Sequence, residues 1–140
     1  MKSVLFLLIS VVILHFVANT FGIYDAQIAA GNVWIDNILH AIVGLAIALL
    51  WTVISKDQEV SSVQAVIKIL AFVAVFAFAW ELLEFAFYIF VPNYATKLQI
   101  YSPSAQEAFM DIISNLGGGA LVIIWKLVRH KSSNFIPDNP

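Results

Sequence analysis

Four long stretches of apolar residues follow one another along the chain, separated by short polar segments. They cover about residues 4–23, 34–55, 66–91 and 108–128. A membrane-spanning helix needs about 20 consecutive, mostly apolar residues, so each stretch is long enough to cross a bilayer, with tilt for the longer ones. The pattern predicts an all-α integral membrane bundle of four transmembrane helices. Residues 1–131 are expected to form a single domain, and residues 132–140 a flexible cytoplasmic tail.

Polar and turn-forming residues mark the ends of these stretches. The breaks are Gly31-Asn32 before the second stretch, residues 56–59 after it, and Pro92-Asn93 after the third. Ser104 is expected to cap the fourth helix, with Glu107 at its third position. Residues 24–30 are moderately apolar and short, so they are expected to lie along the membrane interface.

The composition excludes a soluble domain. Of the 140 residues, 61% are hydrophobic and only 11% are charged, and the mean hydropathy is +0.91. A soluble protein needs far more charge on its surface. The chain contains no cysteine, which excludes disulfides, a thiol nucleophile and a cysteine metal site. It also lacks a basic patch large enough to bind nucleic acid.

Basic residues fall almost entirely on one side of the four-span arrangement. That side holds Lys2, Lys56, Lys68, Lys126, Arg129 and Lys131. Lys97 falls on the other side. Because cytoplasmic loops carry the excess of Lys and Arg, both termini and the middle loop are expected in the cytoplasm. The expected location is therefore a cell membrane.

The first apolar stretch has an alternative interpretation. Lys2 followed by apolar residues is also the pattern of a secretory signal peptide. His15 and Asn19 interrupt this stretch, and no small-x-small cleavage site follows at the usual distance. A transmembrane helix is therefore the favoured interpretation.

Three of the predicted spans carry polar side chains that a bilayer would reject. They are Asp36 and His40 in the second span, Glu81 and Glu84 in the third, and Asp111 and Asn115 in the fourth. An ionisable side chain inside a bilayer costs several kcal/mol unless it pairs, binds an ion or faces water. With a rise of about 1.5 Å per residue, the six groups fall in the same outer half of the membrane. They are therefore expected to form one site.

Helical periodicity places these side chains on one face of each helix. Residues three and four apart share a face, which gives stripes of Asp36, His40 and Gly44, of Glu81 and Glu84, and of Glu107, Asp111, Asn115 and Gly119. His15 and Asn19 make a weaker stripe. Each stripe is expected to face the bundle interior, because lipid cannot satisfy polar groups. Gly44 and glycines 117–119 would let helix backbones approach closely beside the site.

Carboxylates with an imidazole are typical ligands of a divalent metal such as Mg²⁺, Mn²⁺, Fe²⁺ or Zn²⁺. The expected metal ligands are His40, Glu81, Glu84 and Asp111. Glu81, Glu84 and Asp111 are also the candidate catalytic residues, while Asn115 and Asp36 are expected to orient a ligand or substrate. Without a cation, the carboxylates would repel one another and some would hold protons, which could serve proton relay or coupled transport. A purely structural set of interhelical hydrogen bonds is the third interpretation.

The order of these motifs resembles that of VanZ-like membrane proteins and of the related YjdF-like bacterial inner-membrane proteins. The matching motifs are Trp34-Ile-Asp36-Asn37-x-x-His40, Glu81-x-x-Glu84 and Asp111-x-x-x-Asn115-x-x-Gly118. Asn37 and Glu84 stand where VanZ-like proteins tend to have Lys and Gln, which favours the YjdF-like side. VanZ-like proteins are associated with teicoplanin resistance, whereas the resemblance to YjdF-like proteins implies a bacterial inner-membrane protein with a polar site and supplies no substrate.

Two functions follow from these features. The first is a metal-dependent enzyme acting on a lipid or lipid-linked cell-envelope substrate at the outer leaflet, with hydrolase or transferase chemistry. A kinase is disfavoured because no nucleotide-binding motif is visible and an outer-half site lies away from ATP. The second is a non-enzymatic transporter or resistance-type factor that binds protons or cations. It predicts a homo-oligomer, because four spans rarely enclose a pathway alone. Between His40 and Thr52 the second span is wholly apolar, which favours a closed site over a channel.

Overall fold

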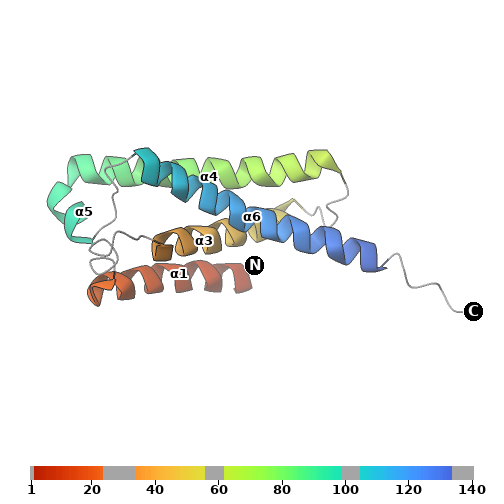
Figure 1. The fold of residues 1–140 in the computed structure, drawn as a ribbon, viewed down its shortest axis with the longest axis horizontal. Helices are drawn as coiled ribbons and strands as arrows, with labels where there is room; N and C mark the ends of the chain where they lie inside the picture. Colours follow the sequence, from red (N-terminus) through yellow and green to blue (C-terminus); the bar gives the residue numbers. More distant parts are fainter. Residues whose placement is uncertain (1, 24–33, 56–61, 99–104, 134–140) are drawn as a thin grey trace, which may run out of the picture.

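The computed structural model describes residues 2–23, 34–55, 62–98 and 105–133, and the regular secondary structure in these ranges is helical (Figure 1). The helices are α1 (Lys2–Thr20), α3 (Trp34–Ile54), α4 (Val63–Phe90), α5 (Pro92–Leu98) and α6 (Ala105–Ser133). The predicted interfacial segment at 24–30, the turn at 31–32, the loop at 56–59, the Ser104 cap and the tail beyond 133 lie outside the described residues.

Three of the helices are long and apolar enough to cross a membrane. These spans are Trp34–Ile54, Val63–Phe90 and Ala105–Arg129. α1 adds the shorter apolar stretch Val4–Ala18. The 19 residues of α1 extend about 28 Å at about 1.5 Å per residue, close to the thickness of a bilayer core. The chain is therefore an all-α membrane bundle, as its apolar stretches predict.

Several helix boundaries differ from the predicted ones. α1 ends at Thr20 and α3 at Ile54, three residues and one residue before their predicted ends, whereas α4 and α6 each begin three residues earlier than predicted. α4 begins at Val63, where Ser62 is the N-cap and accepts a hydrogen bond from the backbone N–H of Ala65. α6 begins at Ala105 and continues to Ser133, so residues 132–133 are helical and not part of a tail. Hydropathy alone does not detect such polar turns.

The short helix α5 was not predicted. Pro92-Asn93 ends α4 as expected, but Pro92 also starts α5, since a proline at the first helical position lacks only an N–H that would be unpaired anyway. Val91 connects the two helices. Its N–H donates to the carbonyl oxygen of Phe87, and its own carbonyl oxygen accepts from the N–H groups of Tyr94 and Ala95.

Successive spanning helices run in opposite directions, so the start of α1 and the end of α6 point to the same end of the bundle, and α5 lies at the other end (Figure 1). A buried cluster joins α3, α4 and α6: Ile47, Ala48, Ile69, Val73, Val122 and Ile123. A smaller cluster of Val11, Ala18 and Leu39 joins α1 to α3. Large apolar side chains such as Phe6, Val75 and Leu121 are exposed on the outside, as expected where lipid is the solvent.

Two glycines let α3 and α6 touch. A Cβ atom added at Gly44 would lie 1.9 Å from the backbone oxygen of Asn115, and one at Gly118 would lie 1.8 Å from that of Ala41. No real Cβ atom fits at such distances, so these backbones are closer than any other residue would allow. The predicted close approach is confirmed at Gly44 and Gly118, whereas a Cβ at Gly117 would meet nothing within 4 Å. This contact sets the position of the polar residues on both helices.

Candidate functional site

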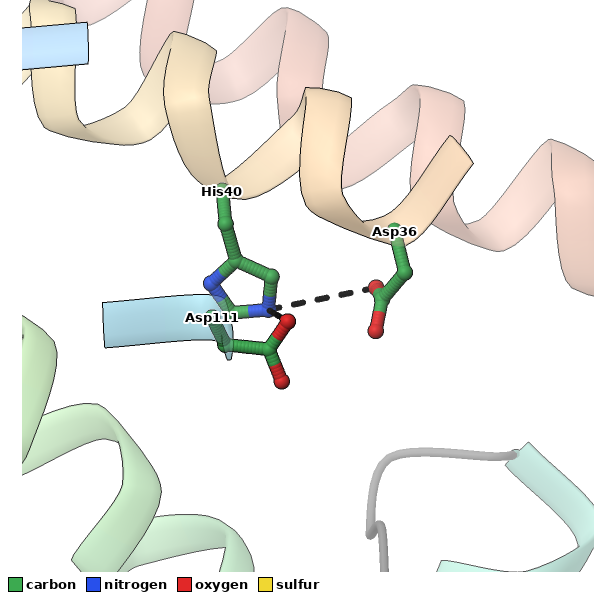
Figure 2. A group of neighbouring side chains, drawn as sticks. All are labelled: Asp36, His40 and Asp111. Atoms are coloured by element: carbon green, nitrogen blue, oxygen red, sulfur yellow. Dashed lines mark ion pairs between the residues drawn. The ribbon is translucent and has the colours of Figure 1, made fainter. Parts of the chain in front are cut away.

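Helices α3 and α6 bring three ionisable side chains together (Figure 2). The start of each of these helices lies at the α5 end of the bundle (Figure 1). Asp36 and His40 lie one turn apart near the start of α3, and Asp111 lies in the second turn of α6. The Nε2 atom of His40 is 3.9 Å from Oδ1 of Asp36 and 3.8 Å from Oδ1 of Asp111. One ligand atom from each residue lies within 4.8 Å of the other two. The three residues are close enough to bind one metal ion.

The distances fit a metal site after small side-chain movements. Ligand atoms about 2.1 Å from a tetrahedral ion lie about 3.4 Å from one another, so the observed distances require shifts on the order of 1 Å. The site is also largely closed. The side chains of His40 and Asp111 are 11% and 6% exposed, whereas that of Asp36 is 35% exposed. Asp36 is thus the accessible side of the group.

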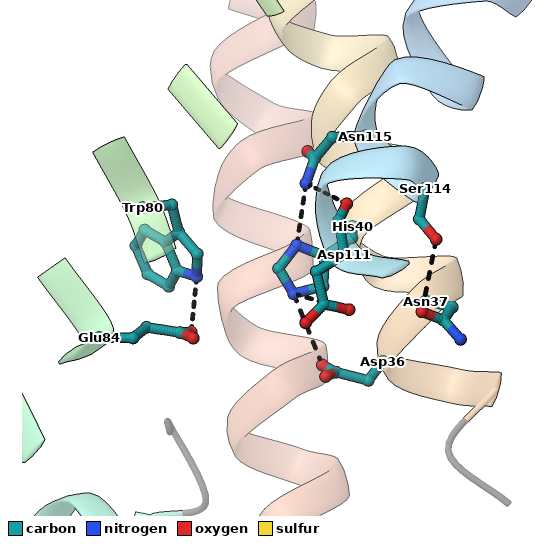
Figure 3. A network of polar contacts seen from close by, with 8 residues as sticks. All are labelled: Asp36, Asn37, His40, Trp80, Glu84, Asp111, Ser114 and Asn115. Carbon is teal, nitrogen blue, oxygen red and sulfur yellow. Dashed lines mark hydrogen bonds and ion pairs between the residues drawn. The ribbon is translucent and has the colours of Figure 1, made fainter. Parts of the chain in front are cut away.

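Asn115 contacts the other ring nitrogen of His40 (Figure 3). Its Nδ2 atom is 3.0 Å from Nδ1 of His40, and the same Nδ2 donates to the backbone oxygen of Asp111 at 2.9 Å. Because an amide nitrogen only donates, Nδ1 of His40 accepts and the ring proton sits on Nε2, between the two carboxylates. The sequence assigned Asn115 to orienting a ligand or substrate. In the structure its amide contacts His40 and the backbone of Asp111.

A second polar contact between α3 and α6 was missed from the sequence. Ser114 Oγ lies 3.4 Å from Oδ1 of Asn37, to which it can donate a hydrogen bond. A signal was available, since Asn37 lies three residues before His40 and Ser114 three residues after Asp111, which puts each near the face of the site. The contact supports the same helix pair that carries the three ionisable groups.

Glu84 faces the group from α4 (Figure 3). Trp80, one turn earlier, donates from Nε1 to Oε1 of Glu84 at 2.6 Å. Glu84 lines the same pocket as Asp36 and His40, but it is not one of the three residues whose ligand atoms cluster. Trp80 was not predicted as a site residue, although its spacing of four from Glu84 was visible in the sequence.

Glu81 lies further from this arrangement than expected. Its Oε1 atom is buried and has no hydrogen-bond partner in the described part of the chain, and Glu81 is not among the residues that line the pocket. The structure thus groups Asp36, rather than Glu81 or Glu84, with His40 and Asp111. Glycine contacts hold α3 against α6, whereas the pocket lies between Glu84 of α4 and the residues of α3. All four carboxylates still lie near enough to repel one another electrostatically.

A pocket of about 320 Å³ lies beside the group, between α1, α3, α4 and Asn115 of α6. Its polar lining is His15, Asp36, His40, Trp80, Glu84 and Asn115. In the antiparallel arrangement of Figure 1, these positions all lie towards the α5 end of their helices. The remaining lining side chains are apolar. His15 also lines the pocket, although it was not predicted as a site residue. The side chain of Asn19 lies outside the described residues.

Comparison with known proteins extends over nearly the whole chain. A family model described as "Predicted membrane protein (DUF2238)" matches residues 1–132. No curated protein and no solved structure matches the chain. The family match supports the expected membrane protein family, but it does not extend to the VanZ-like or YjdF-like families specifically.

Proposed function

We propose that this chain, which belongs to the DUF2238 family of predicted membrane proteins, binds a divalent metal ion and acts on a lipid or lipid-linked substrate. The observation that carries the proposal is the grouping of ligand atoms from Asp36, His40 and Asp111 within 4.8 Å of one another. Two carboxylates and an imidazole form a ligand set that leaves positions open for water and substrate. A cation would also offset the repulsion of carboxylates in a medium of low dielectric constant.

The surrounding residues fit hydrolase or transferase chemistry. A divalent ion held here would supply a Lewis acid beside the pocket. Glu84, positioned by Trp80 and facing the same pocket, is the candidate general acid or base. If His40 held the ion through Nε2, its ring proton would lie on Nδ1, where Oδ1 of a turned Asn115 amide could accept it. Asn115 would then fix the orientation of the imidazole.

The distribution of basic residues supports an outer-leaflet location for this site. Lys2 lies at the start of α1, and Lys126 and Arg129 lie near the end of α6, at the opposite end of the bundle from α5. Lys97 lies on α5 itself. Under the positive-inside rule, the termini are cytoplasmic and the site faces the outer half of the bilayer. The proposed location is a cell membrane of bacterial inner-membrane type.

A proton-binding transporter or resistance-type factor is the second candidate. The observation that favours it is the hydrogen bond from Nδ2 of Asn115 to Nδ1 of His40, which leaves a proton on Nε2 between Asp36 and Asp111. A histidine held in this way by two carboxylates is suited to taking up and releasing protons. This candidate again predicts a homo-oligomer.

Metal content measured by elemental analysis, on protein purified in mild detergent, tests the first proposal. The expected result is about one equivalent of a transition metal in the wild type and its loss in His40→Ala and Asp111→Asn, because a site of three protein ligands does not survive the loss of one. Glu107→Gln is the matched control, since it removes a carboxylate one turn before Asp111 on the same helix.

The opposite result would be no stoichiometric metal in the wild type, together with no thermal stabilisation on titration with Mg²⁺ or Zn²⁺. That outcome would reject the metal site. A neutral His40 with its proton on Nε2, observed by ¹⁵N NMR of histidine-labelled protein, would then support the proton-binding candidate.

A further inference from the structure

The pocket beside the site has the properties of a binding site for part of a lipid. We infer that it takes one acyl chain of a membrane glycerolipid, with the neutral ester group of that chain at His40 and Asp36. The inference deepens the proposed function and rests on it for the chemistry, but not for the binding. It follows from the lining, the length, the opening and the charge of the pocket.

The lining is divided along the bundle axis. The polar side chains gather at the α5 end, and the deeper part is lined by apolar side chains that include Leu8 and Val11 of α1, Val43 and Ile47 of α3, and Ala77 of α4. A ligand that fills the pocket therefore has one polar end and one long apolar part. The volume of about 320 Å³ is at the lower end of the range for small-molecule sites, about 300 to 1,000 Å³.

The length of the pocket suits an extended hydrocarbon chain. On α1 the lining runs from Leu8 to Phe16, and on α3 it runs from Asp36 to Ile47. These intervals correspond to about 12 Å and about 16 Å at about 1.5 Å per residue. A zigzag of C–C bonds about 1.5 Å long advances about 1.25 Å per carbon, so the pocket holds about ten carbons.

The pocket opens towards the surrounding lipid, between α1 and α4. α1 packs on α3 through Val11, Ala18 and Leu39, and among the described residues its extensive contact is with α3 and not with α4. The lining residues at this edge are partly exposed: Val12 52%, Phe16 48%, Phe76 44% and Trp80 48%. Because the edge lies within the spanning helices, a molecule that enters there comes from the bilayer.

The charges of the lining side chains determine which chemical group of a lipid can bind at the polar end of the pocket. Among the described residues, the polar lining contains two carboxylates, Asp36 and Glu84, two imidazoles, His15 and His40, and no lysine or arginine. In the pocket without a bound cation, a phosphate or a free carboxylate would lie beside two carboxylates and no permanent positive charge, which makes its burial costly. A neutral ester needs only hydrogen-bond donors or a metal ion, so it fits. Since a hydrocarbon chain gains little on moving from lipid into an apolar pocket, the ester end decides the specificity.

Photo-crosslinking in vesicles tests the inference directly. The probe is a phosphatidylcholine with a diazirine in the middle of one acyl chain, and the labelled residues are mapped by mass spectrometry. Val11 and Leu39 line the pocket and are each only 7% exposed, so lipid reaches them only through the pocket. We expect adducts on both residues in the wild type, in addition to adducts on exposed residues such as Val75.

A matched pair of variants completes the test. Ala77 is 4% exposed and lines the pocket, whereas Ala79 lies on the exposed side of the same helix. Ala77→Phe fills the pocket, so the adducts on Val11 and Leu39 are expected to be lost while those on Val75 remain, which also shows that the variant is folded and embedded. Ala79→Phe adds the same ring on the exposed side of α4, outside the pocket. This variant is expected to be labelled at the same residues as the wild type.

Two results would overturn the inference. One is an absence of adducts on Val11 and Leu39 in the wild type while Val75 is labelled, as when a second copy of the chain covers the opening. The other is unchanged labelling of the pocket in Ala77→Phe.

The metal measurement separates this failure from that of the proposed function. If the protein contains no metal but its pocket is labelled, and Ala77→Phe abolishes this labelling, the metal site is rejected and the acyl-chain pocket is supported. Bound metal without pocket labelling keeps the metal site and rejects the pocket as a lipid-chain site.

Discussion

His40 has a different partner at each ring nitrogen, and this asymmetry makes Asn115 the most informative residue to change. Nδ1 faces the Asn115 amide, and Nε2 faces the carboxylates of Asp36 and Asp111. An amide can donate or accept at this position by turning over, but a carboxylate can only accept. The residue at position 115 therefore determines which ring nitrogen of His40 carries the proton.

We predict that Asn115→Asp keeps or strengthens metal binding, because its carboxylate accepts the Nδ1 proton and leaves Nε2 free for the metal. Asn115→Leu offers no partner and is expected to weaken binding by about 10- to 100-fold, the usual cost of losing a residue that orients a metal ligand. Titration of Zn²⁺ followed by thermal unfolding in detergent measures both. Equal weakening in the two variants would show that Asn115 does not act through the His40 proton.

At the scale of the helices, the contact between α3 and α6 depends on two glycines, Gly44 and Gly118, which have no side chain. We predict that Gly44→Ala or Gly118→Ala separates the helices and costs about 1 to 3 kcal/mol or more of stability, as overpacking does. The separation would also break the Asn115–His40 contact and lower metal content. Thermal unfolding and elemental analysis of the same samples report the two effects.

Gly117→Ala is the matched control for this prediction. A Cβ atom at this position meets nothing within 4 Å, and alanine favours a helix over glycine by about 0.5 to 1 kcal/mol. The variant is expected to be as stable as the wild type or slightly more stable. Destabilisation equal to that of Gly118→Ala would mean that the glycines act through helix flexibility and not through close contact.

The helical scale also explains which parts of the site the sequence could predict. The meeting of Asp36, His40 and Asp111 follows from rise and periodicity, which any helix shares, and the position of Asn115 one turn after Asp111 follows in the same way. The exclusion of Glu81 and Glu84 from that group could not be predicted. It depends on the distance between helices, which is shortest where Gly44 and Gly118 let the backbones of α3 and α6 meet. α5 was missed because a proline was interpreted only as a helix end.

At the scale of the whole molecule, the orientation proposed from basic residues can be measured with single cysteines. The chain has no cysteine of its own, so each introduced thiol is unique. We predict that Lys97→Cys reacts with a membrane-impermeant maleimide added to intact cells, because α5 faces outwards in the proposed orientation. Arg129→Cys is expected to react only after the cells are permeabilised. The reverse pattern would show that the site lies in the cytoplasmic half of the bilayer, and it would contradict an outer-leaflet substrate.

The division of the site between α3 and α6 has a consequence for the order of synthesis. Asn115 follows His40 by 75 residues, so α3 is made and inserted well before its polar partners exist. During that interval, Asp36 and His40 face the cost of several kcal/mol that an unpaired ionisable group incurs in a bilayer. These two side chains gain their partners only when α6 has been inserted, so we expect a chain that ends before α6 to be degraded faster than the full chain.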